Sequence, residues 1–121
     1  MVKITIPDHR TVGWNYLYQV AHWRKRKQIA DEIHELVWAY CKKLHVPVMN
    51  KRVAIEIVAY AVRPLDPDNV CAKLYIDGLV KAGVLKDDNR KFIEEVTLQS
   101  IKSKHEYLEI KIFEAIDQKC D

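Results

Sequence analysis

Alternating apolar and polar residues open the chain, and they predict a strand over residues 1–7 with Val2, Ile4 and Ile6 on its buried side. The segment from about residue 52 to 62 is apolar at nearly every position and rich in β-branched residues. It is predicted to be a central strand covered on both faces. Residues 92–103 and 107–113 carry two further strand patterns, and the polar segment 102–106 between them is typical of a hairpin connection.

A long helix is predicted from about residue 17 to residue 44. Apolar residues recur there at three- and four-residue steps and would form one buried stripe: Ile29, Ile33, Leu36, Val37, Tyr40, Cys41 and Leu44. The preceding segment, residues 13–16, has no such period and is predicted to be an exposed loop.

A second helix is predicted from about Asn69 to Ala82, with Asp68 as its N-cap and Gly83 as its C-terminal stop. The elements together predict an α/β (α+β) fold in which a mixed sheet of about four to five strands packs against two main helices. The whole of residues 1–121 is expected to form a single domain, with a flexible polar tail at residues 117–121.

Composition narrows the functional classes only a little. The chain is 49% hydrophobic and 31% charged, with a net charge of +3, which permits binding to a polyanion without requiring it. Cys41, Cys71 and Cys120 lack zinc-ligand spacing, and free thiols suit a reducing compartment. With neither a membrane-span pattern nor a signal-peptide pattern, the protein is expected to be cytoplasmic and to have no membrane partner.

The second helix carries a polar stripe made of Asn69, Lys73 and Asp77, while the rest of its circumference is largely apolar. Lys73 and Asp77 could simply pair with each other, four residues apart. The carboxylates around the helix favour a site instead: Asp66 and Asp68 precede it, and Asp87 and Asp88 follow it. Close carboxylates repel unless a proton or cation lies between them, and Mg²⁺ prefers such oxygen ligands.

A basic run, Arg24-Lys25-Arg26-Lys27, lies close to Trp14, Tyr16, Tyr18 and Trp23. Basic residues near the start of a helix oppose its dipole, so they do not serve helix stability. The run could be a solvated face paired with acidic neighbours such as Glu35. The accompanying aromatic residues favour contact with nucleic acid, in which basic groups hold phosphates and rings stack on bases.

The acidic segment resembles the RusA-type endonucleases, the Holliday-junction resolvases of bacteria and their prophages. The similarity covers residues 63–90: Asp66-x-Asp68-Asn69, Lys73-x-x-x-Asp77-Gly78-Leu79, Ala82-Gly83-Val84 and Asp87-Asp88. Trp14-Asn15-Tyr16 and the basic run resemble the family's N-terminal region, although Thr11-Val12-Gly13 replaces its usual Pro-Pro-Ser. Lys73 also lies four residues after Asn69, where the family has three.

The resemblance implies a Mg²⁺-dependent homodimer, with Mn²⁺ as a substitute ion, that makes paired cuts in four-way DNA junctions. It assigns metal binding to Asp66, Asp68 and Asp88 and a catalytic role to these residues and Lys73. Asn69, Asp77 and Asp87 would not contact the metal ion but would position the residues that do the chemistry. Asn69 would orient a carboxylate, and Asp77 would hold Lys73. The expected DNA contacts are Trp14, Asn15, Arg24, Lys25, Arg26, Lys27 and Arg63.

Three other functions stay open on the sequence alone. A metal-dependent phosphohydrolase acting on a small substrate would explain the carboxylates but leave the basic and aromatic segment without a role. A non-catalytic nucleic-acid-binding module would explain that segment but leave the carboxylates without one. A small interaction protein with incidental acidic turns would explain neither feature.

Overall fold

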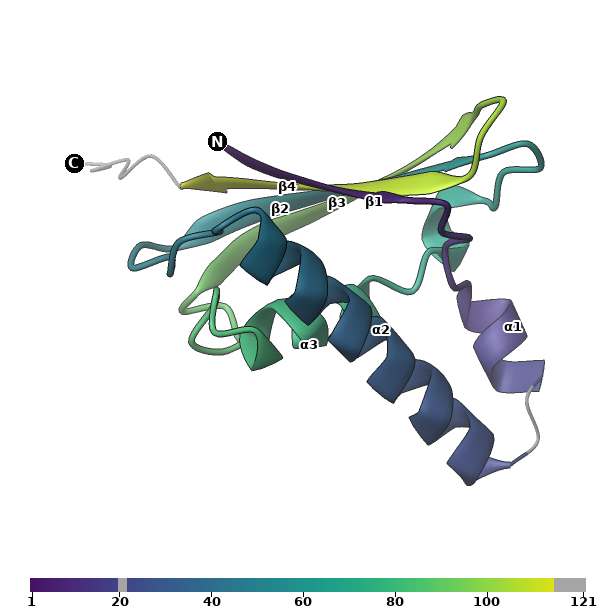
Figure 1. Ribbon diagram of the computed structural model, residues 1–121, viewed down its shortest axis with the longest axis horizontal. Helices are drawn as coiled ribbons and strands as arrows, with labels where there is room; N and C mark the ends of the chain where they lie inside the picture. The colour runs from purple at the N-terminus through teal and green to yellow at the C-terminus, as the bar shows by residue number, and fades with distance from the viewer. Residues whose placement is uncertain (20–21, 115–121) are drawn as a thin grey trace.

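The computed structural model describes residues 1–19 and 22–114 as one sheet with helices on a single side of it (Figure 1). In chain order the elements are β1 (Val2–Pro7), α1 (Trp14–Gln19), α2 (Trp23–Lys43), β2 (Val53–Ala61), a 3₁₀ turn η1 (Pro67–Asn69), α3 (Ala72–Lys81), β3 (Ile93–Lys102) and β4 (Tyr107–Glu114). The predicted fold class and four strands are therefore confirmed. The predicted tail at 117–121 lies outside the described residues.

The strand order in the sheet is β1-β4-β2-β3, with β2 parallel to β3 and antiparallel to β4. The predicted hairpin between β3 and β4 is therefore wrong, because β2 lies between these two strands. Burial explains the arrangement. β4 buries Leu108, Ile110 and Ile112 beneath the helices, whereas β3 buries only Ile93 and occupies an edge.

β2 is central, as predicted, but only one of its faces is covered by helices (Figure 1). The other face is built from side chains of the sheet itself. There Lys3 Nζ lies 2.7 Å from a carboxylate oxygen of the buried Glu109, and the rings of Tyr60 and Tyr107 stack 4.2 Å apart. A hydrogen bond to Glu109 raises the pKa of Tyr60 to about 12. The predicted cover on both faces is therefore complete only on the helical side, since Val58 alone is fully buried on the other.

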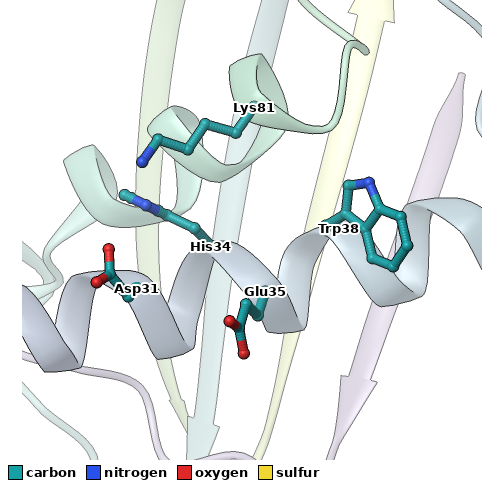
Figure 2. A pocket seen from close by; sticks show the side chains of 5 residues that line it. All are labelled: Asp31, His34, Glu35, Trp38 and Lys81. Atoms are coloured by element: carbon teal, nitrogen blue, oxygen red, sulfur yellow. The ribbon is translucent and has the colours of Figure 1, made fainter.

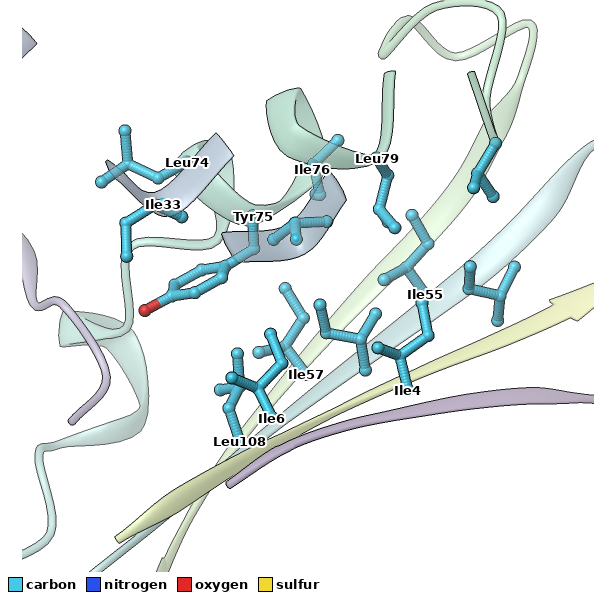
Figure 3. Close-up of a cluster of buried hydrophobic side chains, with 14 of the residues drawn as sticks. Ile4, Ile6, Ile33, Ile55, Ile57, Leu74, Tyr75, Ile76, Leu79 and Leu108 are labelled. Atoms are coloured by element: carbon cyan, nitrogen blue, oxygen red, sulfur yellow. The ribbon is translucent and has the colours of Figure 1, made fainter. Parts of the chain in front are cut away.

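The hydrophobic core fills the space between the sheet and helices α2 and α3 (Figure 3). Isoleucines and leucines from β1, β2 and β4 meet residues of both helices: Ile4, Ile6, Ile55, Ile57 and Leu108 against Ile33, Leu74, Tyr75, Ile76 and Leu79. Each fully buried side chain of this kind contributes on the order of 1.5–3 kcal/mol. The core therefore holds α3, and any site built on it, firmly against the sheet.

The single long helix predicted from residue 17 is instead two helices. α1 covers the segment expected to be a loop and is anchored by the buried Leu17. α2 begins only at Trp23, because His22 has extended backbone angles and its Nδ1 accepts a hydrogen bond from the Arg24 N–H at 3.1 Å. The apolar stripe of α2 is largely confirmed, with Ile29, Ile33, Val37 and Cys41 buried, whereas Leu44 is 47% exposed.

The second helix also starts later than predicted. Asp68 lies inside η1, not at an N-cap, and α3 begins after Cys71. The separation has a physical cause, because Val70 is fully buried in extended conformation and forms a β-bridge with Gly13. A continuous helix from Asn69 would break that bridge. Gly83 ends the helix as predicted, with a positive φ of 80° that glycine adopts without strain.

Candidate active site

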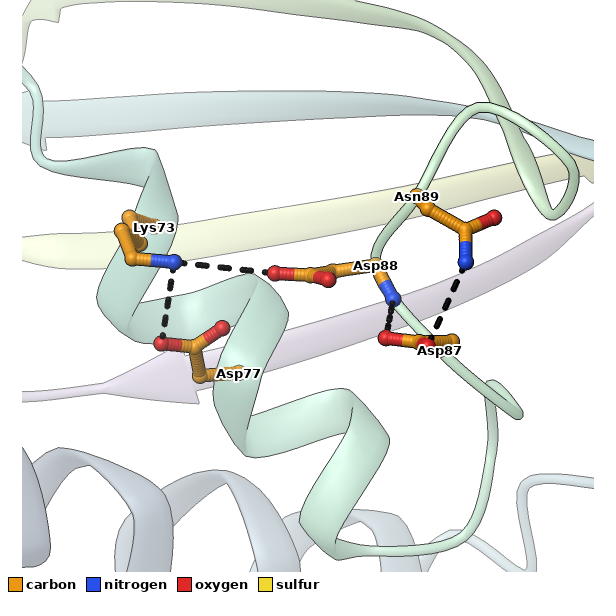
Figure 4. A network of polar contacts seen from close by, with 5 residues as sticks. All are labelled: Lys73, Asp77, Asp87, Asp88 and Asn89. Carbon is orange, nitrogen blue, oxygen red and sulfur yellow. Dashed lines mark hydrogen bonds and ion pairs between the residues drawn. The ribbon is translucent and has the colours of Figure 1, made fainter.

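Lys73, in the first turn of α3, lies between two carboxylates (Figure 4). Its Nζ is 3.7 Å from Asp77 Oδ2 on the same helix and 3.6 Å from Asp88 Oδ2 on the turn that follows α3. The predicted Lys73–Asp77 proximity is thus present, and the fold adds Asp88 to it. Both pairs are accessible, since the lysine side chain is 61% exposed and that of Asp88 is 40% exposed.

The turn at residues 87–91 holds Asp88 in this position. Asp87 Oδ1 accepts from the Asp88 N–H at 2.7 Å, and its Oδ2 accepts from Asn89 Nδ2 at 3.2 Å. Asn89 Oδ1 in turn accepts from the Lys91 N–H at 2.9 Å. Asp87 therefore builds the turn that carries Asp88. Hydrogen bonding with Asp87, together with the positive charge of Lys73, lowers the pKa of Asp88, which stays ionised.

Asp66 and Asp68 lie on the neighbouring loop, in and just before η1, and both are exposed. Neither carboxylate forms a hydrogen bond or ion pair with the residues that the structure describes. Within residues 1–19 and 22–114, no group of three acidic, histidine or cysteine side chains is arranged to hold a metal ion. The free oxygens of Asp66 and Asp68 suit a hard cation chemically, and the structure brings only Asp88 of the three predicted ligands into contact with Lys73.

The Asn69 side chain was expected to orient a carboxylate, but it bonds to the backbone of another segment. It lies outside α3, and its Oδ1 accepts a hydrogen bond from the backbone N–H of Asn15 at 2.9 Å. The side chain thus joins η1 to the start of α1, and the structure pairs it with backbone instead of a carboxylate. Two residues of the predicted DNA-contacting set, Trp14 and Asn15, are thereby placed beside the loop that carries Asp66 and Asp68.

A buried tyrosine holds the segment before α1 in place, a role that the sequence reasoning missed. The Tyr75 hydroxyl accepts from the Val12 N–H at 3.0 Å and shares a hydrogen bond with His9 Nε2 at 2.7 Å. Burial lowers the pKa of His9, so the imidazole is held neutral. A tyrosine on the apolar side of α3 is the signal that could have revealed this, because a buried phenol needs a polar partner.

The basic run occupies the first turns of α2. Arg24 lies over the Trp23 ring at 5.6 Å, Lys27 pairs with Asp31 at 3.0 Å, and Lys25 projects from the exposed surface. Arg26 has an interaction of its own and is exposed. Arg63, just beyond β2, is exposed and has no partner within the described residues. The structure therefore leaves Lys25 and Arg63 available to an anion.

A hollow of about 300 Å³ is lined by residues of α2 and by Lys81 at the end of α3, and Figure 2 shows His34 of α2 pointing toward Lys81. Both ring nitrogens of His34 are buried there without a hydrogen-bond partner in the described chain. Burial, reinforced by the positive charge of Lys81, lowers the pKa of His34, and the nearby Asp77 and Asp31 oppose this effect. Polar groups thus continue from Lys27 and Asp31 toward the Lys73 site.

A groove of about 470 Å³ opens beside Lys73, between α3, the turn at Asp88 and the start of β3. Ala72 and Ile76 form an apolar side, and Arg90 and Glu94 add charge at the rim. The fold and site together define a small α+β domain in which a lysine and several carboxylates border an open groove. No protein-family model matches the chain, and no curated protein is similar enough to it to indicate a relationship. Among the described residues, no helix is both long and apolar enough to cross a membrane.

Proposed function

We propose that the protein is a Mg²⁺-dependent endodeoxyribonuclease that cleaves branched DNA, four-way junctions above all, and acts as a homodimer. The observation that carries this proposal is the Lys73 ammonium group, 3.6 Å from Asp88 and next to an open groove. It supports the roles that the resemblance implies for these two residues. A homodimer suits a four-way junction, which has approximate two-fold symmetry. Branched DNA as substrate would place the protein in the cytoplasm.

Asp66, Asp68 and Asp88 would hold the metal ion, because they are accessible carboxylates with oxygen lone pairs to donate. Bound Mg²⁺ would lower the pKa of a water molecule and neutralise charge on the scissile phosphate. Mn²⁺ would substitute for it. Neither Asp66 nor Asp68 stabilises the fold through a side-chain bond in the described chain, so both carboxylates are available for this task.

Lys73 would act on the phosphate itself. Its ammonium group is shared between Asp77 and Asp88 at 3.6–3.7 Å, distances at which an entering phosphate can compete for it. A fixed positive charge beside the phosphate stabilises the negative charge that develops in the transition state. Asp77, one turn further along α3 and half-buried, would keep the lysine pointing at the groove.

The basic run on α2 and Arg63 would hold the DNA backbone. Lys25 and Arg63 are exposed, and the aromatic rings of Trp14 and Trp23 lie on the same N-terminal helices. Phosphate contacts would come from these cations, since the hollow between α2 and α3 is lined by the carboxylates of Asp31 and Glu35 as well as by Lys81. Contacts of this kind position the DNA without reading its sequence.

The test compares cleavage of a synthetic four-way junction with cleavage of a linear duplex, in Mg²⁺, Mn²⁺ or EDTA. We expect metal-dependent cutting of the junction and little cutting of the duplex. Sedimentation at micromolar concentration should show a dimer. Equal cutting of both substrates would refute the proposed selectivity for junctions but would still show nuclease activity. No cutting of either substrate would refute the proposed nuclease activity.

Asp66→Asn and Asp68→Asn test the carboxylates directly. Both side chains are exposed and unpaired in the described chain, so stability should change by less than about 0.5 kcal/mol. Metal-free binding to the junction should persist or tighten, because a negative charge is removed, while cleavage should collapse. Glu114→Gln is the matched control, since Glu114 is also exposed and unpaired in the described chain but lies at the end of β4, outside the groove. Normal cleavage by both aspartate variants would eliminate the metal site.

A further inference from the structure

A second hollow, of about 370 Å³, lies on the N-terminal side of the loop that carries Asp66 and Asp68. Its lining comes from three parts of the chain: the segment before α1, α1 itself and the residues flanking Asp66–Asp68. The principal residues are Arg10, Thr11, Gly13, Tyr16, Leu65 and Asn69. None of these residues has a role in the cleavage chemistry proposed above.

The walls of this hollow are fixed by hydrogen bonds to the core. Tyr75 holds His9 and the Val12 N–H, and the Val12 carbonyl accepts from the Cys71 N–H at 3.0 Å. Gly13 forms its bridge with Val70 on the same side. The hollow is therefore already formed, and a ligand would not need to order these segments.

Gly13 and Asn69 form a tight corner. A β-carbon at position 13 would lie 2.8 Å from Asn69 Nδ2, so only glycine leaves room for the amide. Asn69 Oδ1 is occupied by the Asn15 N–H, which fixes the orientation of the amide. Its Nδ2 donates to no acceptor among the described residues. A positioned donor is thus available at the wall of the hollow.

The rest of the wall of this hollow consists of an aromatic ring, an apolar side chain, a cation and a buried hydroxyl group. Tyr16 is 53% exposed, and Leu65 supplies an apolar surface. Arg10 is held only by a 3.5 Å contact with Glu106, with its side chain 68% exposed. The hydroxyl of Thr11, a residue 8% exposed, is buried without a partner in the described chain. An exposed ring, an amide donor and a weakly held guanidinium are the groups that recognise a base and its phosphate.

We propose that this hollow binds one unpaired nucleobase of the DNA substrate, stacked on Tyr16, with Arg10 on an adjacent phosphate. The inference rests on the proposed function for the identity of the ligand as DNA. Asn69 would donate to the edge of the base. Leu65 and Asn69 bracket Asp66 and Asp68 in the chain, so a base held here places the neighbouring backbone beside those carboxylates. The pocket would thereby select substrates with bases free to unstack.

The test uses the 121-residue chain without metal, so that binding is measured apart from cleavage. The probe is a single-stranded pentadeoxynucleotide with 2-aminopurine at its centre, whose fluorescence reports stacking. We expect the fluorescence to be quenched on binding, and an oligonucleotide abasic at that position to bind about tenfold more weakly. Tyr16→Ala should lose about tenfold in affinity and should no longer distinguish the abasic oligonucleotide.

Trp38→Ala is the matched control, because Trp38 is an aromatic residue of similar exposure, 48% against 53% for Tyr16, but lies on α2 and does not line the hollow. Gly13→Ala should weaken binding as Tyr16→Ala does, by displacing Asn69. Absence of binding, equal affinity for the abasic oligonucleotide, or equal losses in Tyr16→Ala and Trp38→Ala would overturn the proposal. If the base binds but junctions are never cut, the pocket stands and the nuclease function fails.

Discussion

Gly78 lies where α3 packs most closely against α2, and replacing it with alanine should destabilise the protein. A β-carbon at position 78 would lie 2.9 Å from Val37 Cβ and 3.1 and 3.2 Å from the two Val37 methyl carbons. Val37 is fully buried and branched at Cβ, so it cannot rotate away from the new methyl group. The two helices would have to separate by a few tenths of an ångström.

Two opposing effects set the size of the change in stability. Alanine in place of glycine inside a helix stabilises by about 1 kcal/mol. Inserting a methyl group into a closely packed interface costs about 1–3 kcal/mol. The net expectation is a loss of about 1 kcal/mol, or a melting temperature lower by about 3–5 °C for a domain of this size. Asp77 is the neighbouring residue on α3, so junction cleavage should also fall.

Thermal and urea unfolding of a double-mutant cycle with Val37→Ala would measure the effect. Val37→Ala alone should cost about 2 kcal/mol, because it leaves a cavity in the core. Val37→Ala removes the two methyl contacts at 3.1 and 3.2 Å but keeps Cβ at 2.9 Å, so the double variant should be more stable than the sum of the two single changes by only about 0.5 kcal/mol. A rise in melting temperature for Gly78→Ala, together with no coupling to Val37, would refute the close-packing argument.

Three further predictions concern charge. Lys73→Met should cost at most about 1 kcal/mol of stability, because its ion pairs are exposed, yet slow single-turnover junction cleavage about 100- to 1000-fold; near-normal cleavage would return the lysine to a purely structural pairing. Replacing Lys25 and Lys27 with alanine should reduce the slope of log binding constant against log salt by up to about two units, and an unchanged slope would make the basic run a solvated face. Burial lowers the pKa of His9 below its usual 6.5, so the folded state binds fewer protons and stability should fall as the pH drops from 7 to 5. The free energy of unfolding should fall less steeply with pH in His9→Gln than in the parent protein. Equal slopes in the two proteins would refute the role of His9.

His34 provides the control for the last of these predictions. Burial lowers its pKa as well, so it adds a fall of the same sign in the same pH range. Asp31, Asp88 and Glu109 also have lowered pKa values, but they take up protons only in more acidic solution. A His34→Gln variant measured beside His9→Gln would separate the two histidine contributions.

The sequence by itself determined the elements whose signals are local. Alternation in β1, the continuous apolar run of β2 and the strand patterns of β3 and β4 placed the four strands to within a residue or two. The spacing of Ile29, Ile33, Val37 and Cys41 identified the buried face of α2. Gly83 marked the end of α3 because its backbone angles suit glycine. The pairing of Lys73 with Asp77 followed from helix geometry alone.

Tertiary structure decided everything that depends on residues far apart in the chain. Pairing with Gly13 keeps Val70 extended, which separates η1 from α3 and removes Asp68 from the N-cap position. β4 has an apolar face that must be buried beneath the helices. It therefore lies inside the sheet next to β2, and not next to β3 at the edge.

The candidate site shows the same division. The turn after α3 brings Asp88 to Lys73, and Asn69 joins Asn15 across the fold. Local periodicity carries no information about these contacts, because each depends on how the buried surfaces of separate elements fit together.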